Sequence, residues 1–237
     1  MILFPAIDLY EGKAVRLLRG DYDRMTVYSD YPEEIARDFA ACGATHVHLV
    51  DLEGARSGET PNLNTVLRIR ECTGLFCEIG GGVRSMEVVR RYLDAGLDRV
   101  ILGTAAVEDE DFLIRAVEAY GDRIAVGADI RDGFVAVRGW TEQSAVRMED
   151  FCSRMEEIGV QTLICTDISR DGAMRGTNRE MYRTLSEQFR LQITASGGVS
   201  SLEDVESLRR MNLYGAIIGK AYYTGDIDLK KALEVAR

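Results

Sequence analysis

The chain has 237 residues, of which 46% are hydrophobic and 29% are charged, the balance of an ordinary globular protein. Acidic residues outnumber basic ones by 39 to 29, and the net charge of -10 makes nucleic acids and anionic membranes poor partners. No apolar run approaches the roughly 20 residues that cross a bilayer, and the segment 1–8 lacks the basic start of a signal peptide. We expect a cytoplasmic protein with no nucleic acid, membrane or obligate protein partner.

Cysteine usage agrees with a reducing compartment. The five cysteines are scattered, odd in number and never spaced as C-x-x-C, so we expect small buried side chains rather than disulfides or metal ligands. No cofactor fingerprint appears, and we expect neither a cofactor nor a metal. The cysteines are Cys42, Cys72, Cys77, Cys152 and Cys165.

Short apolar runs alternate with amphipathic stretches along the whole chain, as in parallel strands that are buried on both faces and covered by helices. The stretch 202–211 has the apolar spacing of a helix, Gly43 and Gly159 predict left-handed helix ends, and Ser200 with Glu203 has capping-box spacing. In chain order, the expected strands are 2–7, 46–50, 76–79, 100–102, 124–128, 162–165, 192–195 and 216–218.

Eight βα units of about 30 residues fill the chain without a linker, which predicts an α/β protein with a single (β/α)8 TIM barrel over residues 1–237. The alternative is an open doubly wound sheet, but no G-x-G-x-x-G follows the first strand. An internal repeat at an offset of 116 residues favours the barrel, and it predicts two fused half-barrels of roughly 1–120 and 121–237. Segment 81–85 recurs as 197–201, segment 102–105 recurs as 218–221, and Asp51 corresponds to Asp167.

Two sets of glycines mark expected strand-to-helix turns, where unpaired backbone N–H groups suit an anion. Phosphates in such barrels often lie after strands 7 and 8, and the repeat supplies a second set after strands 3 and 4. Turn formation alone is the alternative for each glycine, but two matched sets favour a bisphosphorylated small-molecule substrate. The expected phosphate-binding residues are Gly81, Gly82, Gly103 and Thr104 in one set and Gly197, Gly198, Gly219 and Lys220 in the other.

Two aspartates follow opposite strands of the expected barrel. Asp8 ends the first strand and Asp129 ends the fifth, so their carboxylates face each other across the mouth. Such a pair suits general acid–base catalysis with one group kept protonated. The alternative for each is a structural role, in which it accepts hydrogen bonds from loop N–H groups. We predict that both are catalytic, and the residues alone do not assign acid and base.

Other candidates carry less weight individually. Thr166 could orient the substrate or a carboxylate, Arg84 could reach the substrate or lie in solvent, and Trp140 could stack on a heteroaromatic base or pack in the core. His46 and His48 share one strand face without further ligands nearby, so we expect barrel-packing histidines rather than a metal site.

Six segments carry a resemblance to a known family: 4–9, 12–17, 48–52, 79–85, 138–140 and 166–172. They resemble the phosphoribosylformimino-aminoimidazole carboxamide ribonucleotide isomerase family of histidine biosynthesis. The resemblance implies a (β/α)8 barrel and a metal-free Amadori rearrangement of an aldose-amine to a ketose-amine, with Asp8 as base and Asp129 as acid. It also implies catalytic or substrate contacts at Thr166, Asp171 and Gly172, and phosphates at the two glycine sets.

Three other functions stay open. The cyclase subunit of imidazole glycerol phosphate synthase shares the aspartates and glycines, although the segments 5–9 and 138–140 favour the isomerase. A dual-substrate isomerase that also acts on phosphoribosylanthranilate would differ in the loops 19–28 and 132–144, which we expect to be mobile. A non-catalytic phosphosugar-binding barrel would not need both aspartates at its mouth.

Overall fold

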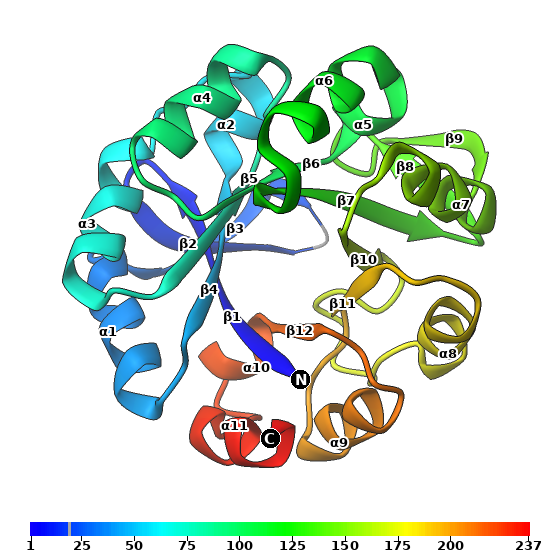
Figure 1. Ribbon diagram of the computed structural model, residues 1–237. Helices are drawn as coiled ribbons and strands as arrows, with labels where there is room; N and C mark the ends of the chain where they lie inside the picture. Colours follow the sequence, from blue (N-terminus) through cyan, green and yellow to red (C-terminus); the bar gives the residue numbers. More distant parts are fainter. Residues whose placement is uncertain (19) are drawn as a thin grey trace.

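Eight parallel strands close into a barrel, as predicted (Figure 1). The computed structural model describes residues 1–18 and 20–237; Arg19, the first residue of the expected loop 19–28, lies outside the described residues. Pairing of β12 with β1 and of β10 with β7 completes the ring. In their order around the barrel, the strands are β1 (Ile2–Tyr10), β4 (His46–Asp51), β5 (Phe76–Gly80), β6 (Arg99–Leu102), β7 (Ile124–Arg131), β10 (Thr162–Asp167), β11 (Gln192–Ser196) and β12 (Gly215–Ile218).

Helices surround the barrel on its outer face (Figure 1). The longer ones are α1 (Pro32–Cys42), α3 (Leu63–Thr73), α4 (Met86–Asp94), α6 (Glu110–Tyr120), α7 (Met148–Ile158), α8 (Arg179–Gln188), α9 (Leu202–Arg210) and α11 (Leu229–Ala236). Shorter turns of helix are α2 (Leu52–Ser57), α5 (Thr104–Glu108), η1 (Gly121–Arg123) and α10 (Lys220–Tyr223).

Two β-hairpins replace most of the loops expected at 19–28 and 132–144. Strands β1 and β7 run on beyond their expected ends and pair antiparallel with β2 (Lys13–Leu18) and β8 (Phe134–Val137). Each hairpin is extended by a third strand, β3 (Asp21–Ser29) or β9 (Glu142–Arg147). These outer strands are largely exposed, so they lack the apolar runs by which the barrel strands are recognised.

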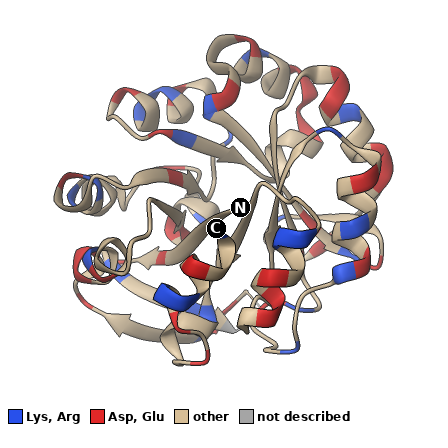
Figure 2. Cartoon of the chain, turned by 60° about the horizontal axis from the view of Figure 1, so that its bottom comes forward, with Lys and Arg blue, Asp and Glu red and all other residues tan. Residues whose placement is uncertain are grey.

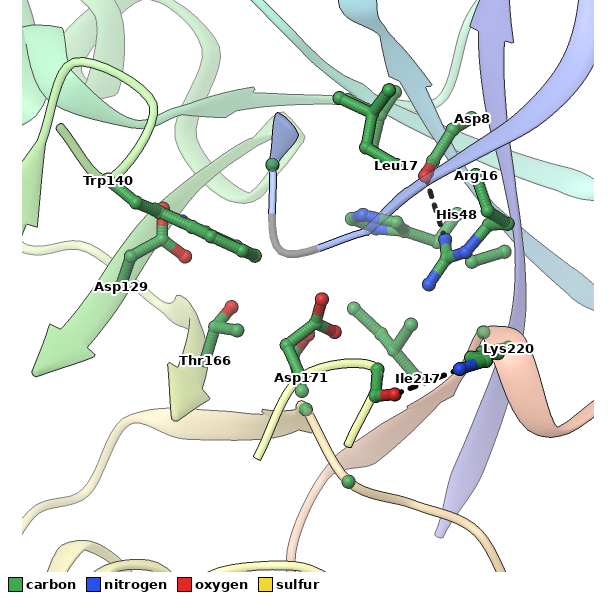
Figure 3. A pocket seen from close by; sticks show the side chains of 18 of the residues that line it. Asp8, Arg16, Leu17, His48, Asp129, Trp140, Thr166, Asp171, Ile217 and Lys220 are labelled. Atoms are coloured by element: carbon green, nitrogen blue, oxygen red, sulfur yellow. Dashed lines mark hydrogen bonds and ion pairs between the residues drawn. The ribbon is translucent and has the colours of Figure 1, made fainter. Parts of the chain in front are cut away.

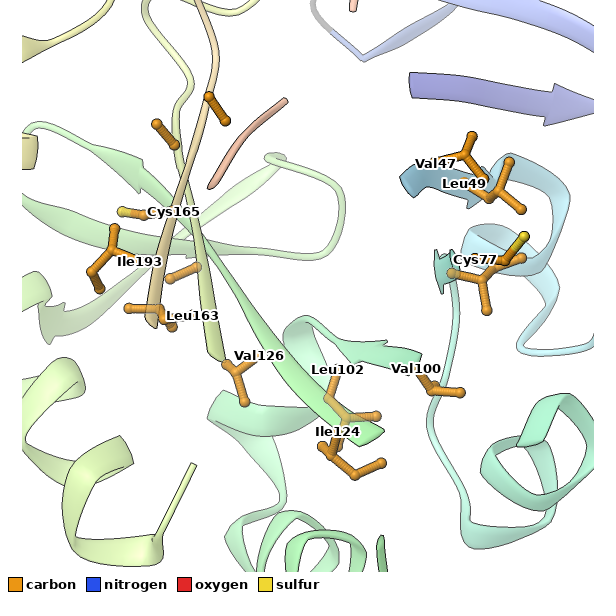
Figure 4. Close-up of a cluster of buried hydrophobic side chains, with 14 of the residues drawn as sticks. Val47, Leu49, Cys77, Val100, Leu102, Ile124, Val126, Leu163, Cys165 and Ile193 are labelled. Carbon is orange, nitrogen blue, oxygen red and sulfur yellow. The ribbon is translucent and has the colours of Figure 1, made fainter. Parts of the chain in front are cut away.

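The main hydrophobic core lies between the barrel and the helices, and Figure 4 shows part of it. Because side chains alternate along a strand, Val47 and Leu49 of β4 join this core, whereas His48 between them faces the barrel interior. A smaller apolar cluster fills the barrel itself, and consists of Phe4, Ala6, Ile101, Ala125, Ile164 and Ile217.

Helix ends follow the expected chemistry with one shift in position. Gly43 and Gly159 end their helices in the left-handed conformation. The capping box is formed by Ser201 and Asp204, one residue later than predicted, because α9 begins at Leu202. The Asp204 carboxylate also accepts hydrogen bonds from the backbone and hydroxyl of Ser200.

The cysteines sit largely as expected. All five cysteines are free; three are buried and two, Cys42 and Cys72, are half-buried. Burial raises the pKa of the Cys77 and Cys152 thiols to about 12. Acidic and basic residues are interspersed along the outer helices (Figure 2). No helix among the described residues has the length and apolarity to cross a membrane.

The two halves of the barrel repeat each other in detail. Asp51 accepts a hydrogen bond from the Asn62 amide, and Asp167 accepts the equivalent bond from Asn178, 116 residues later in each case. We propose that 1–120 and 121–237 are fused half-barrels. Expressing the halves separately tests this proposal: circular dichroism would contradict it if neither half forms the βα structure of the whole chain.

Candidate active site

A cavity of about 310 Å³ opens at the carboxyl ends of the barrel strands. Figure 3 shows the side chains that converge on it from both halves of the barrel. The residues named from the sequence that line it are Asp8, Asp129, Trp140, Thr166, Asp171, Gly172, Gly197, Gly198, Gly219 and Lys220, and Arg16 and His48 line it as well.

Asp8 is held by an ion pair. The hairpin of β1 and β2 pairs Asp8 with Val15, and the next residue, Arg16, places Nη1 2.9 Å from Oδ2 of Asp8. Both side chains are shielded from solvent, at 14% and 16% exposure. The guanidinium also lies on Gly219, where an added Cβ would come 2.9 Å from Cζ of Arg16. A shielded, charge-assisted contact of this kind fixes the position of the Asp8 side chain.

Asp129 has the opposite environment. Burial raises the pKa of this carboxyl, and hydrogen bonds from Trp140 and Thr166 offset only part of that rise. The hairpin register pairs Asp129 with Ala136 as it pairs Asp8 with Val15. The position equivalent to Arg16 is therefore Val137, which carries no charge. One mouth aspartate is ion-paired, whereas the pKa of the other is raised, which suits a base and an acid, respectively.

The second half-barrel supplies a cationic corner of the cavity. Lys220 donates from Nζ to the backbone oxygen of Gly172 at 3.1 Å. The pKa of Asp171 is raised overall, chiefly because the carboxyl is buried. The positive charges of Arg16 and Lys220 lower this pKa, whereas the negative charge of Asp8 raises it. Positive charge beside a glycine-rich backbone is suited to a phosphate.

The first glycine set lies elsewhere. Neither its four residues nor the neighbouring candidate Arg84 are among the described residues that line the cavity. The backbone N–H of Arg138 donates to Oγ1 of Thr104 at 2.8 Å, and Arg84 donates to the backbone oxygen of Ala55 at 2.6 Å. The hairpin turn after β8 thus occupies the Thr104 hydroxyl. The residues outside the cavity lining are Gly81, Gly82, Arg84, Gly103 and Thr104.

Close packing explains the glycine pairs at least as directly as anion binding does. Gly81 and Gly197 have positive φ, and a Cβ there would collide with the backbone of Asp51 or Asp167. Their neighbours Gly82 and Gly198 are equally confined by loop backbone. Because Gly197 and Gly198 also line the cavity, packing and phosphate binding are compatible there.

Trp140 lines the cavity and is not part of the core. Its backbone is left-handed with a φ of 71°, and Arg131 donates to its carbonyl oxygen at 2.8 Å. The ring lies against Gly20 and beside Asp129 (Figure 3). This position leaves a face of the cavity for a ring of the substrate, and stacking remains a prediction.

Sequence reasoning missed two residues of the site. His46 packs between the rings of Phe4 and Phe76, as expected of a barrel-packing histidine, but His48 faces the cavity. Arg16 was overlooked because an arginine on a hairpin strand has no motif of its own. Its spacing from Asp8 across the hairpin could have indicated the pair.

Metal ligation has no obvious place among the side chains of residues 1–18 and 20–237. In this part of the chain, no group of three or more His, Cys, Asp or Glu residues is arranged to hold a metal ion. The two mouth aspartates come from different strands, and each already has its own hydrogen-bond partners.

A family model described as histidine biosynthesis protein matches residues 2–228. The chain belongs to this family. Several members named 1-(5-phosphoribosyl)-5-((5-phosphoribosylamino)methylideneamino) imidazole-4-carboxamide isomerase are similar over nearly their full length. The protein of Oceanobacillus iheyensis is 49% identical over 234 residues, which cover 99% of this chain and 98% of its own. That of Lactococcus lactis subsp. lactis is 50% identical over 233 residues, with 98% of both chains covered. That of Clostridium botulinum is 43% identical over 237 residues, with both chains covered completely.

Proposed function

We propose that the protein is the histidine-biosynthesis isomerase that rearranges this phosphoribosylamino compound from an aldose-amine to a ketose-amine. Membership of the histidine biosynthesis family and the names of its relatives support the reaction. The observation that carries the mechanism is the asymmetry of the mouth aspartates. Asp8 is ion-paired with Arg16, whereas burial raises the pKa of Asp129.

The asymmetry assigns the proton transfers. Asp129, in its protonated form, donates its proton to the ring oxygen of the ribose, which opens to a protonated imine. Asp8, as a carboxylate, removes the proton from C2 and leaves an enolamine. Proton transfer from O2 to C1, through the site or solvent, then yields the 1-amino-ketose. Thr166 is the neighbour of Asp129 in strand register and lowers the pKa of its carboxyl, and we assign it the positioning of Asp129.

Phosphate binding completes the proposal. One phosphate is placed at Gly197, Gly198 and Gly219 beside Lys220, which line the cavity. The other is placed at the first glycine set, where it would take the Thr104 hydroxyl from the backbone of Arg138. The turn after β8 then has to move on binding, and protection of this turn from proteolysis by substrate is the expected consequence.

The proposed cellular setting follows from composition. We infer that the enzyme works in the cytoplasm on a small bisphosphorylated molecule, without nucleic acid, membrane or obligate protein partner. Free cysteines and an acidic chain support this inference. Cell fractionation and size-exclusion chromatography of the native protein test it, and membrane association or a constant second protein would contradict it.

Three assays in parallel test the function. Chelator-treated protein is supplied with the aldose-amine, with the ketose product plus ammonia, and with phosphoribosylanthranilate. Turnover of the first substrate alone is the expected result. Turnover of the third as well would make the enzyme dual-substrate, turnover of the second alone would identify the cyclase, and silence in all three would favour a non-catalytic barrel.

A further inference from the structure

A chain of buried polar side chains leads from the cavity into the barrel. His48, Glu78 and Arg99 are direct neighbours in register on β4, β5 and β6. Nδ1 of His48 lies 2.8 Å from Oε1 of Glu78, and Nη1 of Arg99 lies 3.3 Å from Oε2 of Glu78. The Glu78 side chain is 1% exposed. Phe76 and Tyr214 pack their rings against the Arg99 guanidinium, which holds it in place.

The charges in this chain determine where the His48 proton lies. A guanidinium is cationic and has only donors, and in this ion pair it is matched by the carboxylate form of Glu78. That carboxylate has no proton to give, and the short contact with His48 must be an N–H donated by Nδ1. In the neutral imidazole, the other ring nitrogen, Nε2, then carries the lone pair, on the part of the ring that faces the cavity.

We propose that Glu78 is a positioning residue that acts through His48. It fixes the tautomer with the proton on Nδ1, so that Nε2 accepts a hydrogen bond from an N–H group of the substrate. This target suits the site because His48 and Asp129 line the same cavity, and the ring oxygen protonated by Asp129 and the amine nitrogen share one carbon. The substrate contact rests on the proposed function, whereas the tautomer does not.

Glu78→Gln reverses the tautomer without changing the shape of the side chain. Arg99 can pair only with the amide oxygen, which turns the amide N–H2 toward His48. Nδ1 must then accept, and the proton moves to Nε2. The substrate N–H would face a donor instead of an acceptor. A hydroxyl could rotate to suit either tautomer, so a loss of rate separates an N–H partner from a hydroxyl partner.

Nitrogen NMR reads the tautomer directly. The chain has only two histidines, and His46→Asn assigns the remaining ring signals to His48. The expected result is an Nδ1–H tautomer in the unaltered protein and an Nε2–H tautomer in Glu78→Gln. An Nε2–H tautomer in the unaltered protein overturns the proposal, and this readout stands even if the protein is not the isomerase.

Kinetics test the substrate contact. We expect Glu78→Gln to lower kcat/KM by about tenfold to a hundredfold, the effect of mispairing one buried hydrogen bond. In a His48→Ala background, Glu78→Gln should cause no further loss of kcat/KM, because Glu78 acts through the imidazole ring of His48. A full further loss in that background, or a reversed tautomer with unchanged kcat/KM, overturns the proposal. Glu206→Gln, which breaks an exposed ion pair with Arg210 on α9, is the matched control and should change neither readout.

Discussion

The guanidinium of Arg16 leaves no room for a methyl group at Gly219. A Cβ there would lie 2.9 Å from Cζ of Arg16 and closer still to Nη2. The guanidinium has to withdraw by about 1 Å to restore ordinary contact. Its hydrogen bond to Asp8 is 2.9 Å long, and a shift of that size takes it beyond hydrogen-bonding distance. Gly219→Ala therefore displaces the partner of the catalytic base.

Misplacement of a catalytic group by about 1 Å costs on the order of a hundredfold in rate, which is equivalent to about 2.7 kcal/mol of transition-state stabilisation. We expect Gly219→Ala to lower kcat by this amount in the isomerisation assay. It should also raise KM, because the substituted backbone lies at the proposed phosphate site. In an Arg16→Met background, Gly219→Ala should lower kcat no further.

Gly103→Ala is the matched comparison. Gly103 has φ and ψ of −95° and −112°, and Gly219 has −103° and −109°. Any backbone strain caused by alanine is therefore the same in the two variants. An added Cβ at Gly103 meets no atom within 4 Å. We expect Gly103→Ala to raise KM and keep most of kcat. Equal losses of kcat in the two variants would refute the role given to Arg16.

Three further outcomes follow from the structure. Asp8→Asn and Asp129→Asn should each bind substrate yet lose at least about a hundredfold in kcat; near-normal turnover in either would remove that residue from the mechanism. Thr166→Val removes a hydrogen bond that lowers the pKa of Asp129, and since Asp129 acts protonated, the alkaline limb of the rate profile should move to higher pH. A limb that moves to lower pH would contradict the assignment of Asp129 as acid. Asn62→Ala removes three hydrogen bonds, two of them to buried or shielded carboxylates, and should cost about 1–3 kcal/mol in urea unfolding. Asn178→Ala removes two hydrogen bonds and should lower the free energy of unfolding by less than Asn62→Ala does. A larger loss in Asn178→Ala would show that the number of hydrogen bonds does not determine the loss of stability.

Local sequence patterns determined the barrel and the position of its catalytic end. Most barrel strands are buried on both faces, so they appear as short apolar runs whatever their neighbours are. Asp8 and Asp129 stood out because a carboxylate that directly follows such a run lies at the carboxyl end of the barrel. The exposed strands β3 and β9 were missed for the corresponding reason, since their burial pattern is not continuous.

Apart from the family resemblance, only the tertiary structure distinguished the two aspartates. They have the same place in the repeat, and their difference arises from Arg16 across one hairpin and Val137 across the other. The role of His48 was hidden in the same way, because Glu78 and Arg99 reach it through strand register and not through sequence proximity. Protonation depends on which charges meet at a few ångströms and on how far water is excluded. Arg16 meets Asp8 only when the hairpin forms, and Glu78 meets His48, 30 residues earlier in the chain, only when the barrel strands come into register.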